Sequence, residues 1–380
     1  GGRVMRFSRT DRSTLSLWWW SVDRWSLGIV LLLLAAGLVL SLAASPAIAR
    51  KYDLEAYYFV TRHLMFVLAA GGVMFGVSLM EPHQVRRLGW AVLALSFLGV
   101  LLTLFMAAPV KGARRWLDLG PFALQPSEFM KPAFVIAASA LLAARARLPG
   151  FPGIGLTLLI YGALVLLLVR QPDVGQAVLL TALLALLLFL SGLSWRVVAL
   201  AAAAAGGGLV IAYRTLPHVA ERIDAFVNPA AHDTLQVDRS LSAFMQGDWF
   251  GRGPGAGSIK ENIPDAHTDF VFAVAAEEFG FVACMGLVAL FVVFVLRGLA
   301  RAFRETDFFT QLAASGLTAL IGVQAMVNMG VALQLLPAKG TTLPFLSYGG
   351  SSLMALCLSA GLLLALTRRR PGKALAGEVW

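Results

Sequence analysis

Ten stretches of the sequence, each about 20 residues long and mostly apolar, constrain what this chain can fold into. They cover residues 26–44, 57–80, 88–106, 127–144, 152–169, 173–190, 195–213, 269–296, 309–336 and 344–367. A helix needs about 20 mostly apolar residues to cross a bilayer. A transmembrane β-barrel would instead show segments of about ten residues with alternating polarity. The continuous runs therefore predict an all-α fold, a polytopic integral membrane bundle of about ten helices.

The composition agrees with a chain that is surrounded mostly by lipid. Apolar residues make up 58% of the 380 residues, and charged residues make up 14%. Soluble domains carry about 25% charged residues, because their surface must be covered by polar groups. These proportions exclude a soluble enzyme, a disordered chain and a small disulfide-stabilised scaffold.

The positions of lysine and arginine predict how the bundle lies in the membrane. The segments on the side of the N-terminus hold 17 of the 31 basic residues, and cytoplasmic segments are enriched in Lys and Arg. We therefore expect a protein of the cytoplasmic (inner) membrane with both termini inside, and no nucleic-acid partner. The expected parts are a cytoplasmic tail at 1–25, a transmembrane domain at 26–367 with an extracytoplasmic loop at 214–268, and a cytoplasmic tail at 368–380.

Arg114 and Arg115 oppose this charge bias, because they fall in a short external loop. One interpretation is that they contact phospholipid head groups. The other is that they hold an anionic substrate at the outer leaflet. The sequence alone leaves both interpretations open.

Charged residues within or at the edge of an apolar span are costly unless paired, so each is a candidate for function. Glu128 and Lys131 open the fourth span, and their spacing of three residues places them on one helix face. Ser127 before them is a candidate N-cap. The pair is either a structural salt bridge or part of a catalytic site. Asp173, at the start of the sixth span, is either a helix cap or a site residue.

Asp269 is the sharpest candidate for a catalytic group. It ends the polar string 265–269 and enters a very apolar span. Thr268 is a candidate cap for that helix, which would place Asp269 in its first turn at the outer water boundary. Glu277 and Glu278 lie two to three turns deeper. At least one of them must face the protein interior, because lipid does not tolerate both.

No pattern in the sequence predicts a tightly bound metal or other cofactor. The five histidines and two cysteines lack the spacing of a metal site. The glycine-rich string at 251–258 could form an anion-binding nest, but it lacks the Lys-Ser/Thr ending of a Walker loop. A divalent cation, Mg²⁺ or Mn²⁺, remains compatible with a diphosphate substrate, since such ions keep most of their waters.

Several strings occur together, and in order, in one known family. They are Gly112-Ala113-Arg114-Arg115-Trp116-Leu117, Gln125-Pro126-Ser127-Glu128 through Lys131, Gln171-Pro172-Asp173, His267-Thr268-Asp269-Phe270 with Glu277-Glu278, and Pro337-Ala338-Lys339-Gly340 running to Ser347-Tyr348-Gly349-Gly350-Ser351-Ser352. Over roughly residues 20–370 the chain resembles the SEDS family (shape, elongation, division and sporulation). It resembles the division members more than the elongation members.

The resemblance implies a peptidoglycan glycosyltransferase that polymerises lipid II at the outer face of the cytoplasmic membrane during cell division. It also implies work with a class B penicillin-binding protein (an FtsI-like transpeptidase) and with other division proteins. Asp269 is implied as the catalytic residue. The residues expected to bind the substrate or its pyrophosphate are Lys131, Glu128, Arg114, Arg115, Trp116, Asp173, Lys339 and Ser347. Those expected to support the site are His267, Thr268, Glu277 and Glu278.

The residue types suit this chemistry. Joining lipid-linked sugars requires a base for the acceptor hydroxyl and positive charge for the departing diphosphate. We therefore expect Asp269 to act as general base and Lys131, positioned by Glu128, to belong to the pyrophosphate site. Two alternatives use the same residues. One is a flippase of the lipid-linked precursor, and the other is a non-enzymatic recruiter of a penicillin-binding protein.

Overall fold

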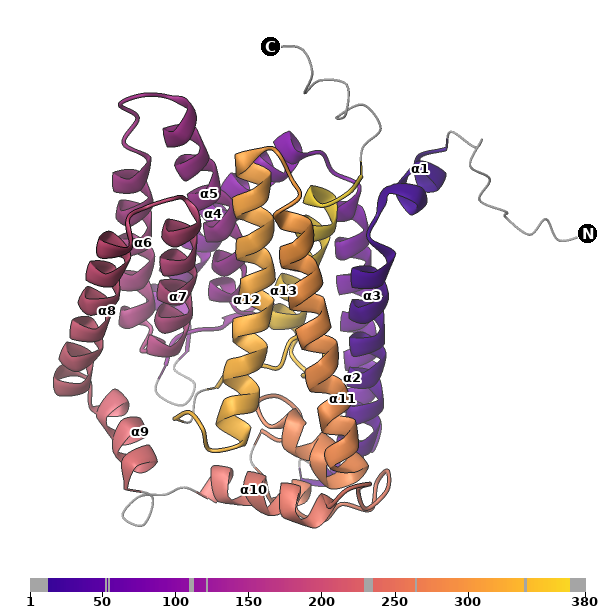
Figure 1. Cartoon of the computed structure of the whole chain (residues 1–380). Helices are drawn as coiled ribbons and strands as arrows, with labels where there is room; N and C mark the ends of the chain where they lie inside the picture. The colour runs from indigo at the N-terminus through magenta and orange to yellow at the C-terminus, as the bar shows by residue number, and fades with distance from the viewer. Residues whose placement is uncertain are drawn as a thin grey trace, which may run out of the picture.

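The computed structural model is a bundle of long α-helices that lie side by side (Figure 1). It describes residues 13–369, apart from 52, 54, 109–112, 121, 229–234, 264, 338 and 339. Each predicted apolar stretch overlaps a helix. These helices are α2 (Arg24–Lys51), α3 (Tyr58–Ser78), α4 (Pro82–Met106), α5 (Pro126–Arg147), α6 (Gly153–Arg170), α7 (Val174–Leu190), α8 (Trp195–Thr215), α11 (Val271–Ala302), α12 (Phe308–Ala332) and α13 (Gly350–Leu366).

The predicted all-α membrane fold is confirmed. Within the described residues, eight of these helices are long and apolar enough to cross a bilayer, whereas α7 and α13 are shorter apolar helices. The number of crossings therefore stays a prediction. Of the predicted tails, residues 1–12 and 370–380 lie outside the described residues.

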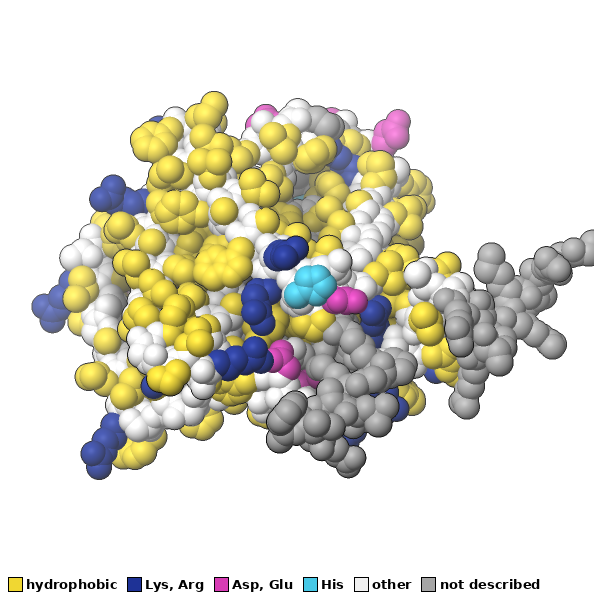
Figure 2. Space-filling view, turned by 90° about the horizontal axis from the view of Figure 1, so that it is seen from above, with side chains coloured by type: hydrophobic (Ala, Val, Ile, Leu, Met, Phe, Trp, Pro, Cys, Tyr) yellow, Lys and Arg dark blue, Asp and Glu magenta, His cyan; other side chains and the backbone are white. Residues whose placement is uncertain are grey.

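The two ends of the bundle carry different elements. We call one the tail end, because the short helix α1 (Thr14–Ser21) and the C-terminal end of α13 lie there. Figure 2 shows basic side chains spread over this end. We call the other the loop end, because it holds α9 (Pro217–Val227), α10 (Leu235–Gly247) and the short 3₁₀ helix η2 (Lys260–Asn262).

A small hairpin at the loop end joins α4 to α5. Its strands are β1 (Leu117–Asp118) and β2 (Ala123–Leu124), paired antiparallel. The backbone N–H of Gln125, directly after β2, donates to Ser351 Oγ of α13 at 2.9 Å. The hairpin therefore attaches the arginine-bearing segment before it to the start of α13.

The last predicted span, residues 344–367, is wrong at its beginning. Residues 341–349 form an irregular loop, and α13 starts only at Gly350. Pro344 cannot donate a helical hydrogen bond, and Phe345 has a positive φ of 66°. The Leu343 N–H donates to Ser347 Oγ at 2.8 Å instead of to a helical carbonyl.

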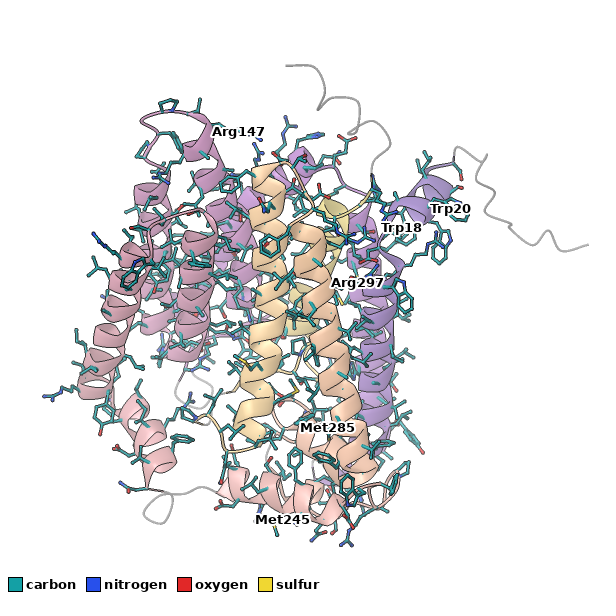
Figure 3. The ribbon with its side chains drawn as sticks, viewed as in Figure 1. Trp18, Trp20, Arg147, Met245, Met285 and Arg297 are labelled. Atoms are coloured by element: carbon teal, nitrogen blue, oxygen red, sulfur yellow. The ribbon has the colours of Figure 1, made fainter. Side chains whose placement is uncertain are left out.

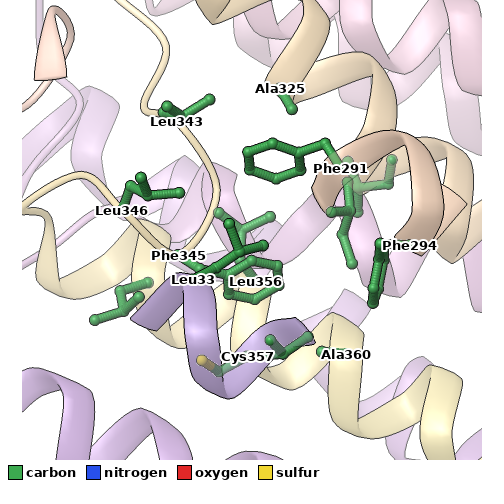
Figure 4. Packing of buried hydrophobic residues seen from close by; sticks show 14 of the residues in the cluster. Leu33, Phe291, Phe294, Ala325, Leu343, Phe345, Leu346, Leu356, Cys357 and Ala360 are labelled. Carbon is green, nitrogen blue, oxygen red and sulfur yellow. The ribbon is translucent and has the colours of Figure 1, made fainter. Parts of the chain in front are cut away.

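This loop lies inside the hydrophobic core. Phe345 and Leu346 are each 1% exposed and pack near Leu33 of α2 and Phe294 of α11 (Figure 4). A Cβ on Gly37 of α2 would lie 2.8 Å from the Phe345 carbonyl oxygen, so the close approach requires glycine. Non-helical backbone is tolerated at membrane depth when protein surrounds it.

A kink at Gly280 divides α11. Gly280 has φ 79° and ψ −178°, a conformation that is essentially limited to glycine. The loop after α10 satisfies the backbone groups that the kink frees. The N–H of Arg252 donates to the carbonyl of Glu277 at 2.9 Å, and the N–H of Phe281 donates to the carbonyl of Asp248 at 2.9 Å.

We expect Gly280→Ala to lower the melting temperature in detergent strongly. The added Cβ would lie 2.3 Å from the Gly251 backbone nitrogen, which is a steric clash. The backbone conformation at this position would add a strain of about 1–3 kcal/mol for a residue other than glycine. Gly286→Ala is the matched control on the same helix, because a Cβ there meets nothing within 4 Å. Equal melting temperatures for the two variants would contradict the proposed role of the kink.

Candidate functional site

A buried ion pair lies at the start of α5. Lys131 Nζ is 2.7 Å from Glu128 Oε2, and the two residues are 2% and 4% exposed. The prediction that they share one helix face and form a pair is confirmed. Ser127 is not the cap that we predicted, because α5 begins at Pro126 with Gln125 as its N-cap. Proline suits the first position of a helix, which moves the start one residue earlier.

Side chains from α7 extend this pair into a network. Gln176 Nε2 donates to Glu128 Oε1 at 2.6 Å. Asp173 caps α7, and its Oδ1 accepts from the Gln176 N–H at 3.3 Å. The prediction of Asp173 as a helix cap is confirmed, and the cap also places it next to the ion pair.

Two amide side chains of α12 join Lys131 to the Asp269 segment. Gln324 Oε1 accepts from Lys131 Nζ at 2.9 Å. Asn328, one turn further along α12, donates to the Asp269 carbonyl oxygen at 2.7 Å and to the carbonyl of Thr341. We did not predict Gln324 and Asn328. The sequence does contain a signal for them: two amide residues stand four residues apart in an apolar span. Such polar groups are costly in a span unless they have partners, so they were candidates for the site.

Asp269 lies at the loop end and is half-buried, but it is not in a helix as predicted. The N-cap of α11 is Phe270. The Asp269 N–H instead donates to the Asp265 carbonyl at 3.0 Å, and Thr268 Oγ1 donates to the same carbonyl at 3.1 Å. Asp265 has a positive φ of 57°, which closes a turn and delays the helix. A Cβ on Gly340 would lie 3.0 Å from Asp269 Oδ2, so the backbone at Gly340 passes beside the carboxylate.

Two arginines bring positive charge to the loop end of this network, beside Asp173 and Asp269. We call this region the mouth of the site. Arg115 Nε is 3.6 Å from Asp173 Oδ2, and its Nη2 donates to the Pro172 carbonyl at 2.5 Å. Arg222 of α9 lies close enough to Arg115, Asp173 and Asp269 for their charges to act on it. Desolvation and the charge of Arg115 lower the pKa of Arg222, and the two carboxylates oppose this change. Arg222 was not predicted, because only the folded loop brings it here.

The remaining predicted binding residues do not join this network. Arg114 is exposed, and its Nη1 donates to the Leu104 carbonyl at 3.3 Å. Trp116 is 37% exposed. Ser347 Oγ accepts from the Leu343 N–H, so it stabilises the buried turn and not the ion pair. Lys339 lies outside the described residues.

Glu277 and Glu278 both face the protein interior and are 0% exposed. Glu277 accepts from the Lys260 N–H at 2.9 Å, and Glu278 accepts from the Gly255 N–H at 2.6 Å and from Lys260 Nζ. The glycine-rich string therefore does bind an anion, and the anion is the protein's own carboxylate. A substrate phosphate is not needed to explain it.

His267 packs in an aromatic cluster beside the Asp269 turn. Its ring centroid is 5.1 Å from that of Phe59 and 5.4 Å from that of Tyr348, and the His63 ring also packs against Tyr348. Burial lowers the pKa of His267 to about 4, and the Asp265 carboxylate opposes this only in part. The folded protein therefore holds His267 neutral.

Lowering the pH from 7 to 5 should reduce the melting temperature, and His267→Asn should remove part of that change. The unfolded chain binds a proton at an ordinary pKa of 6.5, whereas folded His267 does so at about 4. Stability is therefore lost as the pH falls through this window, by at most about 2 kcal/mol over these two units. His83→Asn is the control, because His83 is exposed at the tail end. An unaltered pH dependence in His267→Asn would contradict the assignment.

Comparison with known proteins places the chain in a family. The sequence model of the cell cycle proteins FtsW, RodA and SpoVE matches residues 24–371. A protein of Caulobacter vibrioides named probable peptidoglycan glycosyltransferase FtsW is 43% identical, over 96% of this chain and 94% of its own length.

Solved structures agree with the sequence comparison. A chain of a peptidoglycan synthase complex that coordinates polymerization and crosslinking has a TM-score of 0.75 and 30% identity, covering 91% of this chain and 97% of that one. Rod shape determining protein RodA of Thermus thermophilus has a TM-score of 0.67 and 28% identity, covering 92% and 97%. These matches show that the chain belongs to the FtsW/RodA/SpoVE family, which is the SEDS family.

Proposed function

We propose that this chain is a peptidoglycan glycosyltransferase of the division type, which polymerises lipid II into glycan strands. The single observation that carries the site assignment is that successive turns of α12 bind both segments: Gln324 accepts from Lys131, and Asn328 donates to the backbone carbonyl of Asp269. It supports a carboxylate at the water boundary next to a fixed buried cation. The 43% identity to a relative named as an FtsW glycosyltransferase supports the reaction and the division role.

In the proposed reaction, Asp269 acts as general base. The acceptor hydroxyl attacks the anomeric carbon of the donor sugar, and its proton passes to the Asp269 carboxylate. The bond between that carbon and the diphosphate oxygen breaks, and the polyprenyl diphosphate leaves with the electron pair. A diphosphate is already a good leaving group, so a second carboxylic acid of the glycosidase kind is not required.

Positive charge at the mouth would stabilise the leaving diphosphate. Arg115 and Arg222 supply it, because their guanidinium groups lie on the side of Asp173 and Asp269 and suit phosphate geometry. Lys131 is already paired with Glu128, but an ammonium has three donors and two are used by Glu128 and Gln324. We assign the third to the substrate.

A divalent cation, Mg²⁺ or Mn²⁺, would have to be carried mainly by the diphosphate and water. The described part of the chain has no group of three His, Cys, Asp or Glu side chains that could hold a metal ion. Asp269 and Asp173 could each offer one oxygen to such a hydrated ion, which fits how Mg²⁺ binds with few protein ligands. Bound there, it would neutralise charge on the diphosphate.

We also propose the orientation and the partner. The loop end would face outward, because the tail end carries the basic side chains that stay in the cytoplasm. The partner would be a class B penicillin-binding protein, as the similarity to a synthase complex supports. Other division proteins would assemble with the pair. An apolar groove of about 430 Å³ at the loop end, between α10, α11 and α12, would offer a membrane helix of the partner a packing surface.

The test is polymerisation by the purified protein. Incubation with lipid II, with and without the penicillin-binding protein, should give glycan polymer on a gel. Movement of labelled lipid II between leaflets without any polymer would instead support a flippase. Polymer made only by the partner, and equally with an Asp269 variant, would support a recruiter.

A further inference from the structure

A buried carboxylate at the tail end is shared by two arginines. Asp23, directly before α2, is 2% exposed. Arg297 of α11 binds both of its oxygens, with Nε 2.9 Å from Oδ2 and Nη2 2.6 Å from Oδ1. Ser26 Oγ donates to Oδ2 at 2.8 Å, and Arg301 Nη2 lies 3.2 Å from Oδ1. The acceptor sites of this carboxylate are therefore occupied.

The cluster carries more positive charge than Asp23 can balance. Arg301 is acted on by one carboxylate, that of Asp23, and by the guanidinium groups of Arg297, Arg304 and Arg369. Burial raises the pKa of Asp23, but the hydrogen bonds from Arg297 and Ser26 and the charges of the arginines outweigh burial and lower it. Asp23 is thus ionised at neutral pH. Among the charged groups that act on one another here within the described part of residues 13–369, four arginines face this one carboxylate, which leaves a surplus of three positive charges.

The surplus donors can be reached from outside. The side chains of Arg297 and Arg301 are 33% and 17% exposed, and Arg304 and Arg369 are exposed. Among the described residues, the carboxylate that forms an ion pair with Arg301 is that of Asp23. Accessible guanidinium groups that carboxylates do not fully balance favour phosphate oxygens, which they can bind through two parallel hydrogen bonds.

The surroundings of the cluster are those of a membrane interface. Trp25, two residues after Asp23, is 71% exposed, and tryptophan is enriched at the head-group level. Leu296 of α11 and Phe303, the residue directly after that helix, are 63% and 54% exposed. Because they lie seven residues apart, Leu296 and Phe303 share one side of this segment. That apolar side lies next to the side that carries Arg297 and Arg301. Figure 3 shows Arg297 at the same end as Trp18 and Trp20.

We infer that Arg297, Arg301, Arg304 and Arg369 form a binding site for the phosphate groups of an anionic phospholipid in the leaflet at the tail end. Basic pockets between transmembrane helices bind such head groups. The surplus charge exceeds one, so a lipid with two phosphates, cardiolipin, should bind more tightly than phosphatidylglycerol. The lipid would join the start of α2 to the end of α11, whose other end follows Asp269.

The test titrates the purified full chain in detergent with cardiolipin, phosphatidylglycerol or phosphatidylcholine. Melting temperature and native mass spectrometry report binding. Cardiolipin should raise the melting temperature most and phosphatidylcholine least. Arg301→Gln/Arg304→Gln should weaken the apparent cardiolipin affinity about 30-fold, because each basic residue near anionic lipid raises the affinity about fivefold. Arg304→Gln/Arg369→Gln, with both changes at exposed positions, gives the same readout if the first variant does not fold.

Arg87→Gln/Arg196→Gln is the matched control. It removes the same charge from exposed positions that lie outside the cluster, and it should keep the wild-type affinity. Equal weakening by the control would mean unspecific surface attraction and would overturn the proposal. Inorganic pyrophosphate that displaces cardiolipin and stabilises the protein equally well would overturn the lipid assignment in favour of a soluble phosphate ligand.

Discussion

Asp269→Asn is expected to abolish glycan polymerisation while the protein remains folded. The amide has nearly the shape of the carboxylate but cannot take a proton from the acceptor hydroxyl, and loss of a general base costs about 100-fold to 10,000-fold in rate. Asn328 binds this turn through the Asp269 backbone carbonyl, so the substitution leaves that contact intact. The measurement is the rate of polymer formation from lipid II with the partner present.

Asp265→Asn is the control for this prediction. It makes the same acid-to-amide change in the same turn, and asparagine tolerates the positive φ of 57° found there. We expect this variant to retain most of the wild-type rate. Undiminished polymerisation by Asp269→Asn would remove Asp269 from the mechanism, whatever the control shows.

Lys131→Met should have the second large effect, on stability and activity together. It leaves the Glu128 carboxylate, which is 4% exposed, without its cation. Breaking a buried pair by removing one partner costs about 3–5 kcal/mol. We expect a much lower melting temperature in detergent and no measurable polymer.

The double variant Glu128→Gln/Lys131→Met separates structure from function. It removes both charges, so most of the stability should return, whereas polymerisation should not if Lys131 contacts the diphosphate. Arg147→Gln breaks the more exposed pair with Asp307 at the other end of α5 and should cost less than about 1 kcal/mol. Recovery of full activity in the double variant would reduce the pair to a structural salt bridge.

Local patterns predicted those parts of the site that are close in sequence. The three-residue spacing of Glu128 and Lys131 was enough to place them together, because a helix has a fixed period. Asp173 was identified as a cap by its position before an apolar helix. The two expectations for helix starts that rested on a hydroxyl residue, Ser127 and Thr268, were both wrong. Proline at 126 and the positive φ of Asp265 determine those starts instead.

Contacts between distant segments could not be predicted in this way. Gln324 and Asn328 lie more than 50 residues from Asp269 and nearly 200 from Lys131, yet they join the two. Arg222 lies within reach of the charges of Asp173 and Asp269 only because the folded chain brings α9 to the loop end. The anion held by the glycine-rich string is likewise supplied by the helix that follows it.

The sequence by itself determined that this chain is a bundle of membrane helices, where most of the helices lie, and which charged residues must have partners. These properties depend on apolar length and on the cost of charge in lipid, which act locally on each segment. Only the tertiary structure decided which partners those charges find. Pairing depends on how α5, α7, α12 and the loop before α11 pack, and packing is set by contacts between residues that no local pattern relates.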